Sequence, residues 1–153
     1  RKTFVIDECR PFYTNKRVEI AKNPKVFFID SGFRNAVIDN FQKINQRVDK
    51  GSLHENFVYS EFVKNGLVVK YWRTKSKAEI DFIIEKEQKI IPIEVKSDLK
   101  EPRVTKSIYS FSEKYKPKSV FVLSESLEAK DNFSFGNVMF RPIFSVFKII
   151  EDF

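Results

Sequence analysis

The stretch Ala78–Lys96, with the sequence AEIDFIIEKEQKIIPIEVK, decides the fold of this chain. It contains two runs rich in β-branched and aromatic residues, Ile80–Glu85 and Ile90–Lys96, on either side of the polar segment Lys86–Lys89. Such runs around a polar break predict two β-strands joined as a hairpin. Because Glu87-Gln88 lacks the Gly or Asn that a two-residue turn prefers, we expect a longer loop that keeps the same register.

The register of this hairpin determines the chemistry of its two faces. With the turn centred between residues 87 and 88, one face is predicted to carry only apolar pairs and to belong to the core. These pairs are Ile84 with Ile91, Phe82 with Ile93, and Ile80 with Val95. The opposite face places Asp81 directly across from Glu94, with Lys96 two residues further on and on the face of Glu94. The Cβ atoms of the two acidic residues are then about 5 Å apart.

Two carboxylates in this arrangement need a compensating charge. Like charges directly opposite each other destabilise a hairpin, and burial of an unpaired carboxylate favours its protonated form. Mg²⁺ is one natural partner, since it takes carboxylate oxygens and water as ligands, and a nearby ammonium group can position or polarise a bound water. A structural alternative stays open, in which Asp81 and Lys96 form a plain ion pair beside a solvated Glu94.

The composition suits one globular domain with an ordinary core. The chain has 153 residues, 42% of them hydrophobic and 32% charged. The 28 Lys and Arg exceed the 21 Asp and Glu, giving a net charge of +7. This excess indicates either a polyanionic partner such as nucleic acid or a solvated basic surface.

Several protein classes are disfavoured by single residues. Cys9 is the only cysteine, which excludes an intramolecular disulfide and a thiolate zinc cluster and fits a cytoplasmic location. His54 is the only histidine, so serine-hydrolase and zinc-hydrolase sites are disfavoured, and we expect His54 to be structural. No apolar run of membrane-spanning length occurs, so no membrane partner is predicted. The chain begins with Arg, and we expect it to be part of a longer protein.

A helix is predicted just before the hairpin. Ser52 followed by Glu55 forms an S-x-x-E capping box, and Gly66 provides a stop. In this interpretation Glu55 caps the helix. The functional alternative is that Glu55, on the first turn, reaches the face of Asp81 and Glu94 as a third carboxylate.

A basic loop follows the next predicted strand. The strand Leu67–Trp72, with Trp72 in the core, leads directly into Arg73, Lys75 and Lys77 before the chain returns to the hairpin. The loop places positive charge beside the carboxylates. We predict that these three residues contact nucleic-acid phosphates.

Further elements flank the hairpin on both sides. After it we predict a helix over Arg103–Tyr115, a buried strand over Ser119–Ser124, an edge strand over Gly136–Phe140, and a closing helix or strand from Pro142. The resulting order from residue 51 to residue 124 is helix, three strands, helix, strand. This order predicts an α/β fold in the broad sense, with helices and a mixed sheet arranged as in α+β proteins.

The N-terminal part reads as a β-rich extension. Strands are predicted over Thr3–Ile6, Val18–Ile20 and Lys25–Ile29. A short helix is predicted over Phe33–Phe41 with Val37 and Phe41 facing inward, and Asp30 is expected at its N-cap. The polar segment after residue 41 is taken as a linker. We therefore divide the chain into an extension, residues 1–45, and a catalytic-type domain, residues 46–153.

Together these residues carry a family resemblance. Glu55 on a helix, Asp81 in Ile-Asp-Phe and the Glu94-Val-Lys96 sequence resemble the PD-(D/E)xK nuclease superfamily, with Ile80 where the superfamily name has Pro. The segments KVFFIDSGFRNAVI, GSLHENFVYSEFVKNG, YWRTKSKAEIDFII and PIEVKS resemble one group more narrowly. That group is the nuclease-like domain of unknown function at the C-terminus of bacterial and archaeal AAA-type ATPases.

The resemblance implies a fold, a reaction and partners. The fold is a restriction-endonuclease-like core of order α-β-β-β-α-β, preceded by the tail of a winged-helix-like segment. The reaction is hydrolysis of DNA phosphodiester bonds with Mg²⁺ or Mn²⁺. Asp81 and Glu94 would hold the metal, Glu55 would complete its site, and Lys96 would orient or activate the attacking water. The partners are DNA and an upstream ATP-binding domain of the same protein. The alternative is a catalytically silent DNA-binding or ATPase-regulating module with the same fold.

Overall fold

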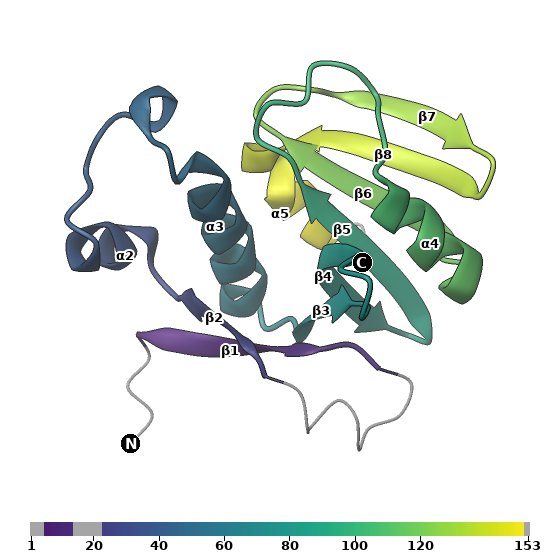
Figure 1. Ribbon diagram of the computed structural model, residues 1–153, viewed down its shortest axis with the longest axis horizontal. Helices are drawn as coiled ribbons and strands as arrows, with labels where there is room; N and C mark the ends of the chain where they lie inside the picture. The colour runs from purple at the N-terminus through teal and green to yellow at the C-terminus, as the bar shows by residue number, and fades with distance from the viewer. Residues whose placement is uncertain (1–4, 14–22, 152–153) are drawn as a thin grey trace.

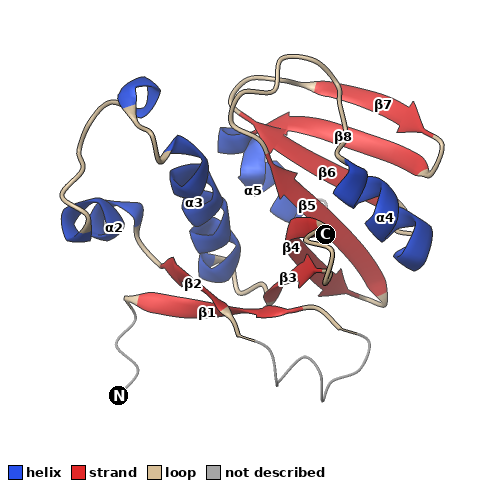
Figure 2. Ribbon diagram, viewed as in Figure 1, coloured by secondary structure: helices blue, strands red, loops and turns tan. Residues whose placement is uncertain are grey.

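The fold is a single mixed β-sheet with helices on both faces (Figures 1 and 2). The computed structural model describes residues 5–13 and 23–151. Its sheet has eight strands in the order β2-β1-β3-β4-β5-β6-β8-β7. Helices α3 and α5 pack on one face and α4 on the other, as Figure 2 shows. This mixed α/β architecture confirms the predicted fold class.

The elements have the following bounds. The strands are β1 (Ile6–Pro11), β2 (Lys25–Phe28), β3 (Val69–Arg73), β4 (Glu79–Lys86), β5 (Lys89–Val95), β6 (Ser119–Ser124), β7 (Ala129–Phe133) and β8 (Gly136–Pro142). The helices are α2 (Ser31–Val37), α3 (Lys50–Lys64), α4 (Lys106–Tyr115) and α5 (Val146–Glu151), with 3-10 turns at Ile44–Gln46 and Ile143–Ser145. The order from α3 to β6 is α-β-β-β-α-β, as the sequence predicted.

The predicted hairpin register of β4 and β5 is confirmed, but its loop is shorter than predicted. Phe82 pairs with Ile93 and Ile84 with Ile91, and the ladder continues to the last pair before the turn. The connection has only two residues, Glu87 and Gln88, with φ of 49° and 63°. These are the φ signs of a type I′ turn, which matches the twist of a hairpin. The long ladder on both sides holds two ordinary residues in this left-handed conformation.

A β-bulge in β4 changes the side-chain pattern at the start of the strand. Against β3, Lys70 pairs with Ile83 and Trp72 with Ile80, so β4 fits one more residue than β3 into this interval. An extra residue reverses the alternation of faces. Ile80 therefore packs with the α4-side core, whereas Val95 packs with the α3-side core. The predicted apolar pair of Ile80 with Val95 on one face is wrong for this reason.

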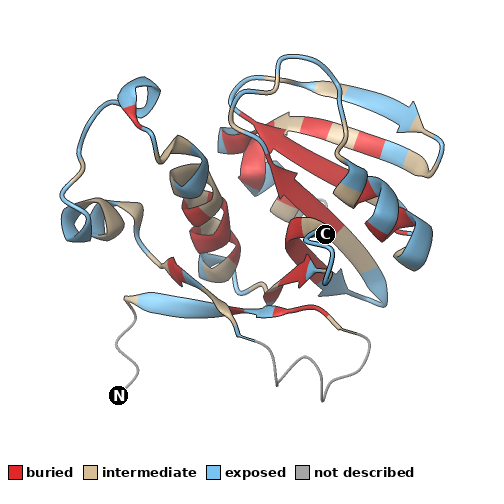
Figure 3. Cartoon of the chain, viewed as in Figure 1, coloured by how far each residue is buried: buried red, intermediate tan, exposed pale blue. Residues whose placement is uncertain are grey.

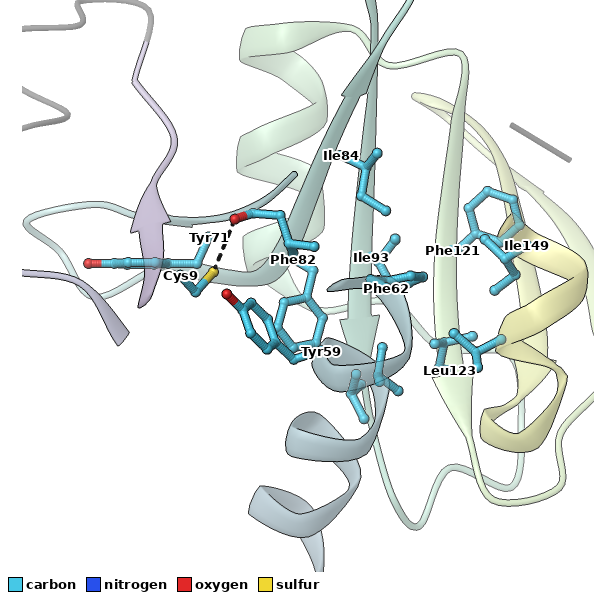
Figure 4. Packing of buried hydrophobic residues seen from close by; sticks show 14 of the residues in the cluster. Cys9, Tyr59, Phe62, Tyr71, Phe82, Ile84, Ile93, Phe121, Leu123 and Ile149 are labelled. Atoms are coloured by element: carbon cyan, nitrogen blue, oxygen red, sulfur yellow. Dashed lines mark hydrogen bonds between the residues drawn. The ribbon is translucent and has the colours of Figure 1, made fainter. Parts of the chain in front are cut away.

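Each face of the sheet has its own apolar core (Figure 3). Residues alternate along β6, so that Phe121 and Leu123 pack toward α3 and α5, while Val120 and Val122 pack toward α4. Figure 4 shows the first of these cores, in which side chains from β4, β5, β6, α3 and α5 point toward one another. Trp72 is buried on the α4 side, as predicted.

Helix α3 begins earlier than the capping box predicted. Its N-cap is Asp49, and Ser52 lies within the first turn rather than before it. The predicted cap formed by Ser52 and Glu55 is therefore wrong, since the chain is already helical two residues before Ser52. The end of the helix is as predicted, because Gly66 adopts φ of +76° just after it. This early start leaves the Glu55 side chain without a capping role.

The C-terminal elements follow the sequence closely with one exception. Strand β6 has the predicted bounds, and α4 starts three residues later than predicted because Thr105 is its N-cap. Strand β8 is not an edge strand, since β7 pairs with it on the outer side. The polar β7 sequence Ala-Lys-Asp-Asn-Phe gave no strand signal. After Pro142 the chain forms a 3-10 turn and then α5.

The N-terminal strands extend the same sheet. Strand β1 pairs with β2 and, through Arg10 and Pro11, in parallel with β3. On the α3 side Phe27 of β2 stacks on Tyr59 with ring centroids 4.4 Å apart. The predicted strand Val18–Ile20 and the first half of Thr3–Ile6 lie outside the described residues. The proposed boundary between residues 45 and 46 stays a prediction.

Helix α2 differs from its prediction. Asp30 is its N-cap as expected, with Oδ1 accepting a hydrogen bond from the Phe33 amide at 2.7 Å. The helix ends at Val37, however, and neither Val37 nor Phe41 faces inward, since their exposed fractions are 59% and 70%. Within the described part of the chain, no helix combines the length and apolar character needed to span a membrane.

Candidate active site

Three acidic residues from three elements lie near one another beside the bulge. Asp81 comes from β4, Glu94 from β5 and Glu55 from α3. Asp81 and Glu94 are buried, with exposed fractions of 8% and 3%, and Glu55 is half-buried. Besides burial, the negative charge of Asp81 raises the pKa of both other carboxyls, so Asp81 interacts electrostatically with each of them. These are the three acidic residues that the sequence predicted.

The bulge positions Asp81. The regular ladder between β4 and β5 runs from the pair Phe82–Ile93 to the turn and does not include the predicted pair Asp81–Glu94. Instead, Asp81 Oδ2 accepts a hydrogen bond from the Val95 amide at 2.8 Å. Burial raises the pKa of Asp81, against the lowering effect of that amide and of Lys96. Among the described residues, Oδ1 of Asp81 has no hydrogen-bond partner.

Glu94 is fixed through both of its oxygens. Its Oε1 lies 2.8 Å from Lys96 Nζ, and its Oε2 accepts a hydrogen bond from Thr105 Oγ1 at 2.9 Å. Thr105 is the N-cap of α4, so the start of this helix is tied to the site. Burial raises the pKa of Glu94, and Lys96 lowers it. The alternative of an Asp81–Lys96 ion pair beside a solvated Glu94 is wrong, because Lys96 pairs with Glu94 and Glu94 is buried.

Glu55 is the carboxyl without a fixed partner. It forms no hydrogen bond and no ion pair with any residue that the structure describes. Burial, and next the charge of Asp81, raise its pKa from 4.5 to about 7, although Lys25 and Lys96 act in the opposite direction. The charges of Asp81 on β4 and of Lys96 just after β5 therefore act on a side chain near the start of α3.

Lys25 and Glu79 belong to the same site and were missed from the sequence. Lys25 of β2 forms an ion pair with Glu79. The same ammonium also interacts electrostatically with Asp81 and Glu55. Glu79 precedes Asp81 by two residues, which is a local signal for a second acidic side chain near the site. Lys25 gave no such signal, since only the tertiary fold brings β2 beside this end of β4.

The start of α3 is fastened to the segment that follows Lys96. His54 Nδ1 lies 2.8 Å from Ser97 Oγ, and Lys50 Nζ lies 2.5 Å from Asp98 Oδ1. Both contacts join α3 to residues directly after β5. They hold Glu55 opposite Lys96. His54 has the structural role that the sequence predicted.

The basic loop lies at the edge of the site. Three exposed cations lie here, Arg73 at the end of β3 and Lys75 and Lys77 in the connection to β4. Arg73 Nε lies 2.5 Å from Glu79 Oε2, which links the loop to the Lys25–Glu79 pair. Within the described residues, neither Lys75 nor Lys77 has an ion-pair partner. Two lysine charges are thus available beside the carboxylates.

The chemistry of the donor set fits a hard divalent cation. The side chains concerned, Glu55, Asp81 and Glu94, offer carboxylate oxygens only, which suit Mg²⁺ or Mn²⁺. As they stand, no three His, Cys, Asp or Glu side chains in the described part of the chain are grouped closely enough to hold a metal ion. Two features nevertheless favour an added cation, namely the raised pKa of each carboxyl and the unpartnered Oδ1 of Asp81.

Comparison with known families gives one match. A family model described as a domain of unknown function (DUF4143) matches residues 50–143. The matched segment runs from the start of α3 to just past β8 and contains Glu55, Asp81, Glu94 and Lys96. It leaves out β1 and β2, and therefore Lys25. No curated protein sequence matches the chain.

Proposed function

The chain belongs to the DUF4143 family, a domain of unknown function, and we propose that it is a metal-dependent nuclease domain that hydrolyses phosphodiester bonds of DNA. The proposal assigns it to the PD-(D/E)xK superfamily. One observation carries it: at the bulge, the charge of buried Asp81 acts on Glu55, on Glu94 and on Lys96. Buried carboxylates with raised pKa values around a lysine are typical of a catalytic site rather than of a stabilising ion pair.

Asp81, Glu94 and Glu55 would hold Mg²⁺ or Mn²⁺ in this proposal. The bound cation would supply Lewis-acid chemistry, neutralising charge on the phosphoryl group and lowering the pKa of a water ligand. The acidic residues therefore have a binding role. The buried position of Asp81 and Glu94 strengthens their interaction with any cation, since water screens it little.

Lys96 is a positioning cation for the attacking water rather than a proton acceptor. Burial lowers its pKa, but Glu94, Asp81 and Glu55 raise it, and the balance lies above the ordinary value. The ammonium group therefore keeps its proton at neutral pH.

The surroundings support a nucleic-acid substrate and a larger assembly. The net charge of +7 and the exposed Lys75 and Lys77 favour binding of a polyanion. We propose an ATP-binding AAA-type domain of the same protein as the partner, from the sequence resemblance. The single buried Cys9 fits a reducing compartment such as the cytoplasm.

Plasmid nicking tests the proposal. With Mg²⁺ or Mn²⁺ we expect the wild type to nick supercoiled DNA, and Asp81→Asn and Lys96→Met to reduce the rate roughly 100-fold or more. Calorimetric titration with Mn²⁺ gives a second readout, in which Asp81→Asn abolishes binding. Matched controls are Glu85→Gln on β4 and Lys89→Gln on β5, at the far end of the same hairpin, and both are expected to keep full activity.

Two outcomes would contradict the proposal. Nicking that persists at the wild-type rate in Asp81→Asn and Lys96→Met would place the activity elsewhere. Salt-dependent DNA binding without nicking in either metal, together with no Mn²⁺ binding, would instead support the silent DNA-binding or regulatory module.

A further inference from the structure

A cleft adjoins the carboxylate site on the side of the basic loop. It has a volume of about 310 Å³ and lies between the start of β2, the end of β3 and the loop after β3. Its lining includes two tyrosines, Tyr13 and Tyr71, and three cations, Lys25, Arg73 and Lys75. The volume is at the lower end of the range for small-ligand pockets, about 300–1,000 Å³, which suits one nucleotide but not a base pair.

The cleft carries an uncompensated positive charge. Glu79 pairs with both Lys25 and Arg73, so one carboxylate is shared between two cations. Lys75 is exposed and has no ion-pair partner within the described residues. The cleft lining therefore holds three cations and pairs with one carboxylate, that of Glu79, and this excess of positive charge attracts an anion. A phosphate group fits this requirement, because Arg and Lys are its usual ligands.

The walls of the cleft are fixed by hydrogen bonds. Tyr71 Oη donates to the Asn23 carbonyl at 2.8 Å, and its ring lies 5.4 Å below Lys25 Nζ. Tyr13 Oη donates to the Arg73 carbonyl at 3.4 Å. Both rings line the cleft, and Tyr71 is buried whereas Tyr13 is only half-buried. An aromatic ring beside cations is the combination that holds a base and its phosphate.

The cleft and the carboxylate site are neighbours along one strand. Glu79, which pairs with Lys25 and Arg73 of the cleft, is two residues from Asp81, so it lies at most roughly 7 Å away along β4. Phosphates of one DNA strand repeat every 3.4 Å or so along the helix axis. A strand whose scissile phosphate lies at Asp81 and Glu94 therefore has a nucleotide one or two positions away at the cleft.

We propose that this cleft binds one unstacked nucleotide of the DNA strand, next to the scissile phosphate. Lys75 and Arg73 contact its phosphate, and the ring of Tyr13 stacks on its base. The inference rests on the proposed nuclease function and adds to it a preference for strands with an accessible base, meaning single strands and frayed ends rather than intact duplex.

Binding of a fluorescein-labelled oligo-dT strand in EDTA tests the cleft without any hydrolysis. Tyr13→Ala should weaken binding roughly tenfold, from lost stacking, and Tyr13→Phe should retain it.

Lys75→Gln should lower the slope of log Kd against log salt concentration by about 0.7, as expected for one lost phosphate contact on a single strand. The matched control Lys130→Gln removes the same charge from the exposed surface of β7 and should leave the slope unchanged. The Tyr13→Ala effect should fall below twofold with a blunt duplex.

Two results would overturn the cleft proposal. One is equal loss of affinity in Lys75→Gln and Lys130→Gln, which would mean that only net charge matters. The other is wild-type affinity in Tyr13→Ala, with Trp72 fluorescence showing a folded protein. Either result leaves the nuclease proposal standing if Asp81-dependent nicking is observed. Conversely, DNA binding that depends on Tyr13 and Lys75, without nicking, would refute only the nuclease function and not the cleft.

Discussion

Glu55 is the site residue for which the sequence leaves two roles open, a helix cap and a third carboxylate. The earlier start of α3 at Lys50 removes the first, and the electrostatic effect of Asp81 on Glu55 supports the second. Periodicity alone did not separate them, because the first helical residue depends on contacts beyond the helix. One such contact is the ion pair of Lys50 with Asp98.

The raised pKa of Glu55 makes a specific pH prediction. Folding raises this pKa from 4.5 to about 7, so the folded state binds more protons between these values than the unfolded state. The free energy of unfolding therefore falls as pH rises through this window, and the loss is complete above pH 7 or so. Glu55→Gln removes the loss and should stabilise the protein by about 2 kcal/mol at pH 8, after allowance for solvent screening.

Urea unfolding at pH 8 and below about pH 4 measures this difference. The gain in Glu55→Gln should shrink toward zero below about pH 4, where the wild-type carboxyl is protonated in both states. Glu61→Gln, on the same helix and paired with Lys64, serves as the control and should change stability little at either pH. An equal gain in Glu55→Gln at both pH values would contradict the assignment.

At the scale of elements, the hairpin of β4 and β5 shows what local pattern determines. The alternation of apolar residues set the register correctly, since a slip by one residue would move every side chain to the other face. The loop length did not follow from composition. Glu87 and Gln88 are ordinary residues in the left-handed region, where a Cβ costs about 1–2 kcal/mol. The ladder of the hairpin offsets this cost.

The turn can therefore be improved by one substitution. Gln88 has φ of 63°, and Gly has no Cβ penalty there, so Gln88→Gly should raise the free energy of unfolding by roughly 0.5–1 kcal/mol. Chemical denaturation with fluorescence of Trp72 measures the change. Gln42→Gly, in an exposed segment without positive φ, is the control and should not stabilise. A lower denaturation midpoint for Gln88→Gly would show that the side chain makes a compensating contact.

At the scale of the whole molecule, the N-terminal strands and the matched family segment share one sheet. Lys25 of β2 lies outside residues 50–143 but contributes charge to the carboxylate site. Phe27 of the same strand packs against Tyr59 and Phe82. The α3-side core and part of the site are therefore built in part from β2, which lies outside the matched segment.

This shared core predicts cooperative unfolding. Phe27→Ala should lower the free energy of unfolding by about 3 kcal/mol, since it empties a buried aromatic site. Trp72 lies in the other core, and its fluorescence should report the same shift as far-UV circular dichroism. Val26→Ala, at an exposed neighbouring position, should have little effect. A Trp72 transition that stays at the wild-type midpoint would show that β2 unfolds separately.

The sequence by itself determined the features that depend on neighbouring residues. Periodicity, which depends on residues close together in the sequence, predicts most strands and the main helices. It also predicts the α-β-β-β-α-β order and the pairing of Phe82 with Ile93. Only the tertiary structure decided the bulge that turns Ile80 to the other core, the position of Lys25, and the direction of Glu55. Each depends on strands or helices far apart in the sequence, whose packing and shared charges no local pattern encodes.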